Sequence, residues 1–316
     1  MLIKTPKGWE IPDREATPEH IYWNRREILK SAGFLAAASP LGFTAPLWAD
    51  DKAKSLYPAK RNSEFELDRP ITPEWAATGY NNFYEFHPTD KQAVKDLVGK
   101  FKSEPWTIEV KGLTNKPQTL DIADLLKTFP LEERTYRFRC VEAWSMAVPW
   151  TGFPMAALIK KLEPKPEAKY VRFISVMRKD EQPGLKMAPW YPWPYFEALR
   201  MDEAMNPLAM FVTGIYGKPL PAQNGAPFRV IVPWKYGYKN PKSIVTIEFV
   251  SKEPSTFWYK QQPAEYGFFS NVNPAKPHPR WSQAQEKAIP TMAVRPTLMY
   301  NGYEKWVAGM YTGKEF

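Results

Sequence analysis

Segments of alternating apolar and polar residues recur along the chain from residue 106 onwards. This period of two predicts β-strands, and five segments show it: Trp106–Val110, Thr135–Cys140, Tyr170–Val176, Phe228–Pro233 and Ser243–Val250. A helical spacing of apolar residues predicts four short helices: Ile122–Phe129, Met155–Leu162, Tyr195–Met205 and Ser282–Ile289. The two kinds of element do not alternate strictly, so the pattern predicts a single α+β domain rather than a doubly wound sheet.

Turn and cap residues agree with these elements. Asp121 precedes the predicted helix at Ile122 and suits the N-cap position. Asn224-Gly225 and Asn301-Gly302 mark tight turns. The chain has 33 prolines, which interrupt regular structure often and therefore predict a loop-rich fold.

The N-terminus has the pattern of an export signal. Asn24 and the pair Arg25-Arg26 are followed by an apolar pair and a lysine, close to the twin-arginine consensus. The apolar run from Ser31 to Phe43 is too short for a bilayer, which needs about 20 residues. An ordinary amphipathic helix is the alternative. We expect a twin-arginine signal peptide over residues 1–49, an extended lead-in segment over 50–78, and the folded domain over 79–316.

The chain has few cysteine and histidine side chains that could bind a metal ion, and this restricts its chemistry. One cysteine and three histidines exclude an intrachain disulfide, a CxxC redox pair, a zinc ribbon and an iron–sulfur cluster. If the protein carries a metal, the cofactor must supply most of its ligands. The sequence also lacks GxGxxG, P-loop, GxSxG and HExxH motifs, which removes the usual support for nicotinamide, nucleotide, serine-hydrolase and zinc-protease chemistry.

The net charge of +9 points to an anionic partner or cofactor. Positive residues are spread along the chain without a Lys/Arg-rich run or a recognisable nucleic-acid motif, so we expect no nucleic-acid partner.

The lone cysteine, Cys140, comes at the end of a predicted strand, where a loop rich in Trp and Pro is expected to begin. Arg137 and Arg139 flank it, and nearby arginines are expected to lower the thiol pKa and favour the metal-binding thiolate. Two other interpretations stay open. Cys140 could be a small buried hydrophobe, or it could pair with His87 or His278 in nucleophilic catalysis.

Two further clusters carry groups suited to a polar ligand. Residues 79–87 combine amides and aromatics, which suits a polar heterocycle, with a capped turn as the alternative. Residues 221–242 predict a tight turn, a strand and a basic loop that could bind an anion through Arg229, with Lys235, Lys239 and Lys242 adding charge. The alternative there is an Asn-Gly hairpin with a solvated loop.

In this order the clusters resemble the family of periplasmic protein-methionine-sulfoxide reductase catalytic subunits, in the sulfite oxidase superfamily. The resemblance spans nearly all of the mature chain. The matching stretches are residues 79–86, 129–134, 139–146, 221–229, 233–237, 265–268, 271–274 and 278–283.

The resemblance implies a mixed α/β molybdopterin-binding domain of the sulfite oxidase type. Cys140 would ligate molybdenum beside the dithiolene and oxo ligands of the Mo-molybdopterin cofactor, and Arg229 and Tyr84 would be catalytic. The implied cofactor-binding residues are Asn81, Tyr84, Glu85, Ser175, Asn224, Arg229, Asn240, Pro241 and Lys242.

The resemblance also implies a function and partners. The enzyme would reduce methionine sulfoxide in periplasmic proteins, in both configurations at sulfur. Its electrons would come from a membrane haem-binding subunit fed by quinones, and the twin-arginine translocase would export it folded to the periplasm as a soluble protein. A sulfite-oxidising dehydrogenase and a cofactor-free periplasmic binding protein are the alternatives.

Overall fold

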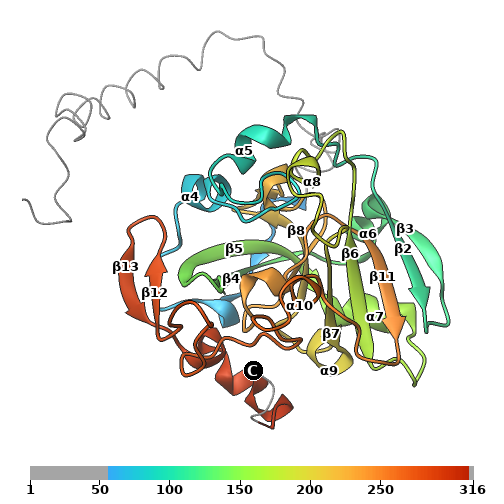
Figure 1. Ribbon diagram of the computed structural model, residues 1–316. Helices are drawn as coiled ribbons and strands as arrows, with labels where there is room; N and C mark the ends of the chain where they lie inside the picture. Colours follow the sequence, from blue (N-terminus) through green and yellow to red (C-terminus); the bar gives the residue numbers. More distant parts are fainter. Residues whose placement is uncertain (1–55, 313–316) are drawn as a thin grey trace, which may run out of the picture. The chain divides into compact units, whose positions relative to one another are not determined.

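The computed structural model describes residues 56–312, which belong to one structural unit, Pro46–Phe316. Within these residues, one sheet has eight strands, with the order β1-β4-β5-β12-β13 and with β8 joining β5 to β9 and β10 (Figure 1). Its strands are β1 (Lys60–Arg61), β4 (Glu132–Arg139), β5 (Trp144–Pro154), β8 (Met210–Ile215), β9 (Lys218–Pro219), β10 (Arg229–Ile231), β12 (Gln285–Ala288) and β13 (Ala293–Pro296).

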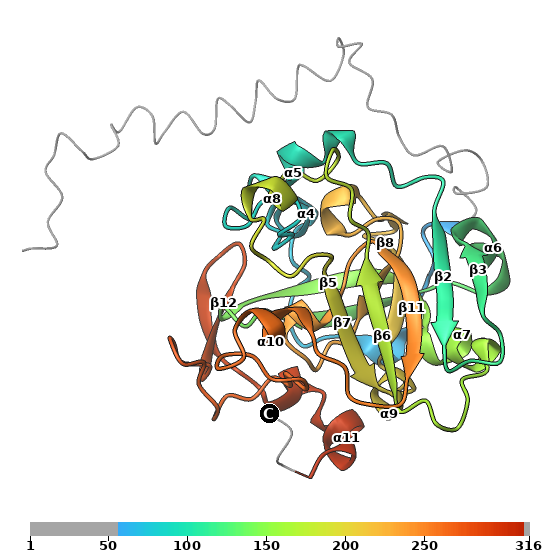
Figure 2. The ribbon, with the colours of Figure 1, turned by 45° about the vertical axis from the view of Figure 1, so that its right-hand side comes forward.

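The second sheet has five strands in the order β3-β2-β11-β6-β7. Figure 2 shows these strands side by side, with the long β5 of the first sheet passing behind them. The β2–β11 pair is parallel, and the other three pairs are antiparallel. The strands are β2 (Thr107–Gly112), β3 (Gln118–Asp121), β6 (Tyr170–Ser175), β7 (Phe196–Arg200) and β11 (Ile244–Val250).

Short helices connect the strands in the described part of the chain. The α-helices are α4 (Glu74–Gly79), α5 (Val94–Leu97), α6 (Ile122–Thr128), α7 (Met155–Leu162), α8 (Gly184–Met187), α9 (Met201–Ala204), α10 (Phe257–Gln261) and α11 (Glu304–Val307). The 3-10 turns are η4 (Ser63–Phe65), η5 (Val98–Lys100), η6 (Ala222–Asn224), η7 (Gly237–Lys239), η8 (Met299–Gly302) and η9 (Ala308–Met310).

The predicted α+β class is confirmed, as are all five predicted strands and the helices α6 and α7, with small differences at their ends. Asp121 caps α6, because its side chain accepts a hydrogen bond from the Ala123 N–H at 2.7 Å. The two sheets share one apolar core, in which Phe173 of β6 contacts Phe211 of β8 with ring centroids 5.9 Å apart.

Two predicted helices are wrong. Tyr195–Met205 forms the edge strand β7 followed by the single turn α9, and Ser282–Ile289 contains β12, which pairs with both β5 and β13. Apolar residues that are buried on both faces of a strand have no period of two, so β7 resembles a buried helix in sequence.

The Trp- and Pro-rich segment after Cys140 is the strand β5 and not a loop. Ten of its residues are buried, and it pairs with β4 on one side and β8 on the other. Pro149 cannot donate a ladder hydrogen bond, but its carbonyl accepts one from Tyr216 N at 3.1 Å. A central strand therefore tolerates the prolines that indicate a loop in the sequence.

The predicted signal peptide, residues 1–49, lies outside the described residues. Of the predicted lead-in segment, residues 56–78 contain β1, η4 and most of α4, and β1 pairs in parallel with β4. Phe65 packs edge-on against Tyr136 with ring centroids 5.4 Å apart. No helix within residues 56–312 combines the length and the apolar character needed to cross a bilayer.

Candidate active site

A cavity of about 670 Å³ opens beside Cys140. Small-molecule sites usually have volumes of about 300–1,000 Å³. The cavity is lined by residues from segments far apart in the chain, because the loop after α4, the end of β4, the turn η6 and the loop before β11 meet here. The predicted site residues that line it are Asn81, Tyr84, Glu85, Cys140, Asn224, Arg229 and Lys242.

Three predicted site residues, Ser175, Asn240 and Pro241, do not line this cavity. Asn240 instead holds its own loop, because its Oδ1 accepts from Val232 N at 2.5 Å and its Nδ2 donates to the Gly237 carbonyl at 3.0 Å. The Pro241 carbonyl accepts from Val230 N at 3.0 Å. Both residues therefore shape the loop that carries Lys242.

Cys140 sits in a tight turn between β4 and β5. Its N–H donates to the Trp144 carbonyl at 2.9 Å, and Ala143 takes a left-handed conformation with φ of 63°. The buried Sγ accepts hydrogen bonds from Asn82 Nδ2 and from Glu142 N, each at 3.5 Å. A polar amide thus lies against the sulfur.

Neither of the two histidines in the described residues, His87 and His278, pairs with Cys140. Nδ1 of His87 accepts the backbone N–H groups of Thr89 and Asp90 at 3.3 and 2.8 Å. His278 stacks on Trp281 with ring centroids 3.8 Å apart. Because both histidines contact these other groups, the Cys–His pair considered for nucleophilic catalysis is wrong.

The expected lowering of the thiol pKa is also wrong. Burial raises the pKa of Cys140 to about 12, and the Glu142 carboxylate raises it further, while Arg139 lowers it by less. The Arg139 guanidinium is directed to other groups: it pairs with Glu286 at 3.3 Å and donates to Gln283 Oε1 at 2.8 Å. In such surroundings a thiolate needs an added positive charge, such as a bound metal ion.

Glu142 is a residue of the site that the sequence patterns do not reveal. Its Oε2 accepts from Asn82 Nδ2 at 3.2 Å and from Trp144 Nε1 at 3.0 Å, and lies 3.1 Å from Lys91 Nζ. All four residues line the cavity. Asn82 belongs to the amide-rich cluster and could have been chosen with Asn81, whereas only the fold brings Lys91 to Glu142.

Arg229 lines one part of the cavity and has hydrogen-bond donors without partners among the described residues. Its Nη1 donates to the Asn224 carbonyl at 2.6 Å, and its guanidinium lies 4.8 Å from the centre of the Trp150 ring. Its Nε and Nη2 are buried, as are Asn224 Oδ1 and Ser175 Oγ, and none of these atoms has a hydrogen-bond partner among residues 56–312. Burial lowers the pKa of Arg229 to about 9.

Such an arrangement fits a polar, anionic group. Unpaired buried donors and acceptors are costly, so they indicate a ligand that satisfies them, and a phosphate-bearing pterin has both suitable charge and suitable polar edges. In the described part of the chain, no group of three or more His, Cys, Asp and Glu side chains could hold a metal ion. A metal bonded to Cys140 would therefore take its remaining ligands from its cofactor.

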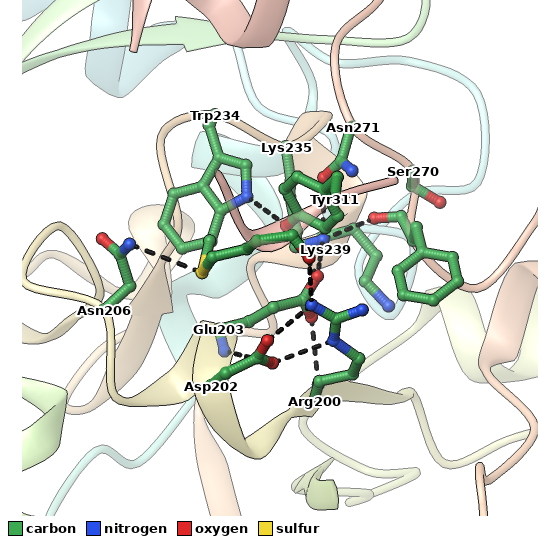
Figure 3. A network of polar contacts seen from close by, with 12 residues as sticks. Arg200, Asp202, Glu203, Asn206, Trp234, Lys235, Lys239, Ser270, Asn271 and Tyr311 are labelled. Carbon is green, nitrogen blue, oxygen red and sulfur yellow. Dashed lines mark hydrogen bonds and ion pairs between the residues drawn. The ribbon is translucent and has the colours of Figure 1, made fainter. Parts of the chain in front are cut away.

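Two lysines of the basic loop before β11, Lys235 and Lys239, differ from both interpretations of its sequence, whereas Arg229 and Lys242 line the cavity. Lys235 pairs with Glu203 and Lys239 with Glu197, each at 2.6 Å, and all four side chains are buried. Figure 3 shows Lys235 among Glu203, Asn271 and Tyr311, and Lys239 beside them. These lysines neither add charge to an anion site nor lie in a solvated loop, because a buried ammonium needs a nearby carboxylate.

Close packing behind Tyr84 and Glu85 leads to a first prediction. A Cβ on Gly184 would lie 2.1 Å from the Tyr84 carbonyl oxygen and 2.7 Å from the Glu85 carbonyl carbon, both backbone atoms. We expect Gly184→Ala to displace this segment and destabilise the protein by about 1–3 kcal/mol. Thermal unfolding measures the loss, and metal analysis shows whether cofactor binding falls with it. Gly267→Ala, where the Cβ meets nothing within 4 Å, is the control, and equal stability of the two variants would contradict the prediction.

Comparison with known proteins agrees with this geometry. Residues 95–258 match the oxidoreductase molybdopterin binding domain family. Over 329 aligned residues the chain is 48% identical to the protein-methionine-sulfoxide reductase catalytic subunit MsrP of Ralstonia nicotianae, covering 100% of this chain and 98% of the relative. The protein of the same name from Burkholderia mallei is 50% identical with the same coverage. That of Pseudomonas syringae pv. tomato is 45% identical, covering 99% of this chain and 98% of the relative. The chain therefore belongs to the family of protein-methionine-sulfoxide reductase catalytic subunits and carries their molybdopterin-binding oxidoreductase domain.

Proposed function

We propose that this protein reduces methionine sulfoxide residues of exported proteins with a molybdenum ion held by molybdopterin. The observation that carries the proposal is the position of Cys140, whose sulfur lies at a cavity of about 670 Å³ inside a molybdopterin-binding domain. One protein thiolate would suffice, because the pterin dithiolene would supply further sulfur ligands. Names of the curated relatives support the sulfoxide substrate.

The chain's own residues divide into two roles. Cys140 is the metal ligand, held in place by the turn to Trp144 and contacted by Asn82. Arg229 and the amide of Asn224 present unsatisfied polar atoms to the pterin and its phosphate. The cofactor-binding residues that we assign on the cavity wall are Asn81, Tyr84, Glu85, Asn224, Arg229 and Lys242. For three residues outside the cavity lining, a role in cofactor binding stays a prediction: Ser175, Asn240 and Pro241.

Sulfoxide reduction consumes two electrons and two protons and yields a thioether and water. When held by Cys140, the cofactor would supply the two electrons and a site for the sulfoxide oxygen. Hydrogen-bond donors should stabilise that oxygen as negative charge develops on it. Burial raises the pKa of Tyr84, so its phenol stays protonated and can donate. Tyr84 and Arg229 both line the cavity and are our candidates for this role.

Sulfite oxidation fits the cavity less well. An anionic substrate needs positive charge, but Arg229 and Lys242 are assigned to the cofactor, and the other two cations at the cavity are paired. Lys91 lies 3.1 Å from Glu142, and Arg280 lies 2.8 Å from Glu265. A neutral sulfoxide has no such requirement. The match to a molybdopterin-binding domain argues against a cofactor-free binding protein.

We further propose that the enzyme works in the periplasm with a second subunit. The twin-arginine pattern around Arg25-Arg26 supports export of the folded, cofactor-loaded protein. The description of the relatives as catalytic subunits supports a partner, for which we propose a membrane haem protein that takes electrons from quinones.

A direct test uses the purified full-length protein from a host that makes molybdopterin. Reduced viologen supplies electrons, and oxidation of the dye is followed with methionine sulfoxide, while sulfite is tested with an electron acceptor. We expect molybdenum near one atom per chain and turnover of the sulfoxide alone. Turnover of sulfite alone, or protein without molybdenum, would reject the proposal.

Arg229→Met leads to a second prediction. It keeps a long apolar stem against Trp150 but removes the unpaired Nε and Nη2 donors. Because a charged hydrogen bond contributes about 1.5–3 kcal/mol, we expect a fall of about 10- to 100-fold in molybdopterin retention or in turnover. Metal content separates the two roles, since lost metal indicates cofactor binding and lost turnover with full metal indicates stabilisation of the oxygen. Full metal together with full activity would exclude both.

A further inference from the structure

Aromatic side chains form a continuous array along another part of the cavity. Trp258 is central: its ring centroid lies 4.9 Å from that of Tyr84, 5.9 Å from Tyr191 and 5.3 Å from Tyr266. Beyond Tyr266 the array continues through the stacked pair of His278 and Trp281. We define the aromatic wall as its cavity-lining members other than Tyr84: Tyr191, Trp258, Tyr266 and Trp281.

The wall and the polar lining come from different segments. Residues 81–85 and 224–242 contribute the amides and charges that we assign to the cofactor, whereas the wall comes from Tyr191 and from residues 258–281. Two residues of the polar segments contact the wall: Tyr84 packs against Trp258, and Tyr238 packs against Tyr266 with ring centroids 5.3 Å apart. The cavity therefore has one region suited to a polar cofactor and another suited to an apolar group.

A hydrogen bond connects the wall to the metal-ligand segment. Trp281 Nε1 donates to the carbonyl of Val141, the residue after Cys140, at 2.7 Å. Behind the wall, Phe257 is fully buried and packs against Trp258 with ring centroids 5.4 Å apart. The rings are thus fixed in position before any substrate binds, beside the residue that would hold the metal.

The wall also leaves little free charge on its side of the cavity. Arg280 lies 4.9 Å from the centre of the Trp281 ring, but its guanidinium donates to Glu265 at 2.8 Å. Glu265 also lies 3.4 Å from His278 Nε2. A ligand at this wall therefore contacts aromatic faces, while the charged side chains nearby are paired with one another.

A methyl sulfoxide matches such a surface. Its sulfur and the attached methyl group carry partial positive charge, and aromatic faces attract positive charge and polarisable sulfur. The thioether product has less charge on sulfur, so the same faces should hold it more weakly and let it leave. With the oxygen directed to the metal, the two configurations at sulfur differ only by exchange of methyl and methylene, and aromatic faces can accept either group.

We infer that the aromatic wall binds the methyl and methylene groups of the methionine sulfoxide side chain, with Trp258 as the specificity-determining residue. This inference rests on the proposed function. It assigns substrate recognition to the aromatic side of the cavity and leaves the polar side to the cofactor.

The test compares Trp258→Leu with Trp258→Phe in the full-length, molybdenum-loaded enzyme. Calorimetry of the oxidised enzyme, which cannot turn over, gives the Kd for a peptide with one methionine sulfoxide, and steady-state assays give KM and kcat. Losing a sulfur–aromatic contact should weaken binding by about 3- to 30-fold. We expect Trp258→Leu to raise Kd and KM by such a factor for both configurations, with metal content unchanged and kcat within about 3-fold.

Trp258→Phe retains an aromatic face and should bind within about 3-fold of wild type. Trp75→Leu, which removes an exposed tryptophan of α4 outside the cavity, is the control and should change neither constant.

Should Trp258→Leu fail to fold, Tyr266→Leu replaces it with the same expectation. Unchanged Kd and KM in a metal-loaded leucine variant, or a loss confined to kcat, would overturn the inference while the wild-type activity stands. Wild-type enzyme that neither binds nor reduces the sulfoxide peptide would overturn the proposed function itself, and the inference with it.

Discussion

Cys140→Ser is expected to remove molybdenum and sulfoxide reduction together while leaving the fold intact. The serine hydroxyl fits the buried turn and can still accept from Asn82, but it loses its proton far less readily than a thiol and is therefore a weaker anionic ligand for a metal. Loss of an outer partner of a metal site already costs about 10- to 100-fold in affinity or activity, so loss of the protein's ligand should cost more than about 100-fold. Metal analysis, circular dichroism and the dye-linked assay on one preparation measure all three properties.

Met177→Ser is the matched control for this change, because it replaces another sulfur-containing side chain at an exposed position. It should retain both metal and activity. Retained sulfoxide turnover in Cys140→Ser would refute the ligand assignment. Loss of the folded signal would place Cys140 among packing residues instead.

Glu203→Ala is expected to cause the largest loss of stability. The Glu203 Oε1 atom accepts from Lys235 Nζ at 2.6 Å and from Tyr311 OH at 2.7 Å, so this carboxylate joins the loop before β11 to the C-terminal segment (Figure 3). Removing one partner of a buried ion pair costs about 3–5 kcal/mol because the other charge stays buried. For a domain of this size we expect Tm to fall by on the order of 10 °C, as measured by calorimetry of the loaded enzyme.

Asp180→Ala breaks an exposed pair with Lys186 and serves as the control, with little change expected in Tm. The double variant Glu203→Leu, Lys235→Met removes both charges and should recover much of the loss, because an apolar pair needs no compensation. If the single and double variants unfold at the same temperature, the unpaired charge is not the cause. Altered metal content in Glu203→Ala would show that the pair also positions the loop that carries Lys242.

Local patterns predict the elements that have one buried and one exposed face, such as β2, β6, β11 and α7. α7 has one apolar face, and its predicted limits, Met155–Leu162, are the observed ones; Asp121 is the cap of α6, as its position in the sequence predicts. Two of the failures, at β5 and β7, occur where burial removes the period of two. β5 has ten buried residues and two prolines, and β7 is buried along most of its length, so neither shows an alternation that sequence can reveal.

Charge was harder to interpret than hydrophobicity. Arg139 precedes Cys140 in sequence, yet its guanidinium pairs with Glu286 of β12, and burial controls the thiol pKa instead. Lys235 and Lys239 resemble an anion-binding loop, but Glu203 and Glu197 neutralise them. The partner of a long charged side chain depends on which distant segment packs beside it, and spacing along the chain holds no information on that.

The sequence by itself determined the lone thiol at Cys140, the α+β class and the motifs that resemble the family, because composition, periodicity and ordered motifs are properties of the chain alone. The tertiary structure decided which groups surround that thiol. Asn82 and Glu142 contact it, Arg229 keeps unpaired donors on the cavity wall, and an aromatic wall is anchored beside Val141. The Asn82–Cys140 and Trp281–Val141 contacts join residues 58 and 140 positions apart, and only packing of the two sheets and their loops brings such segments together.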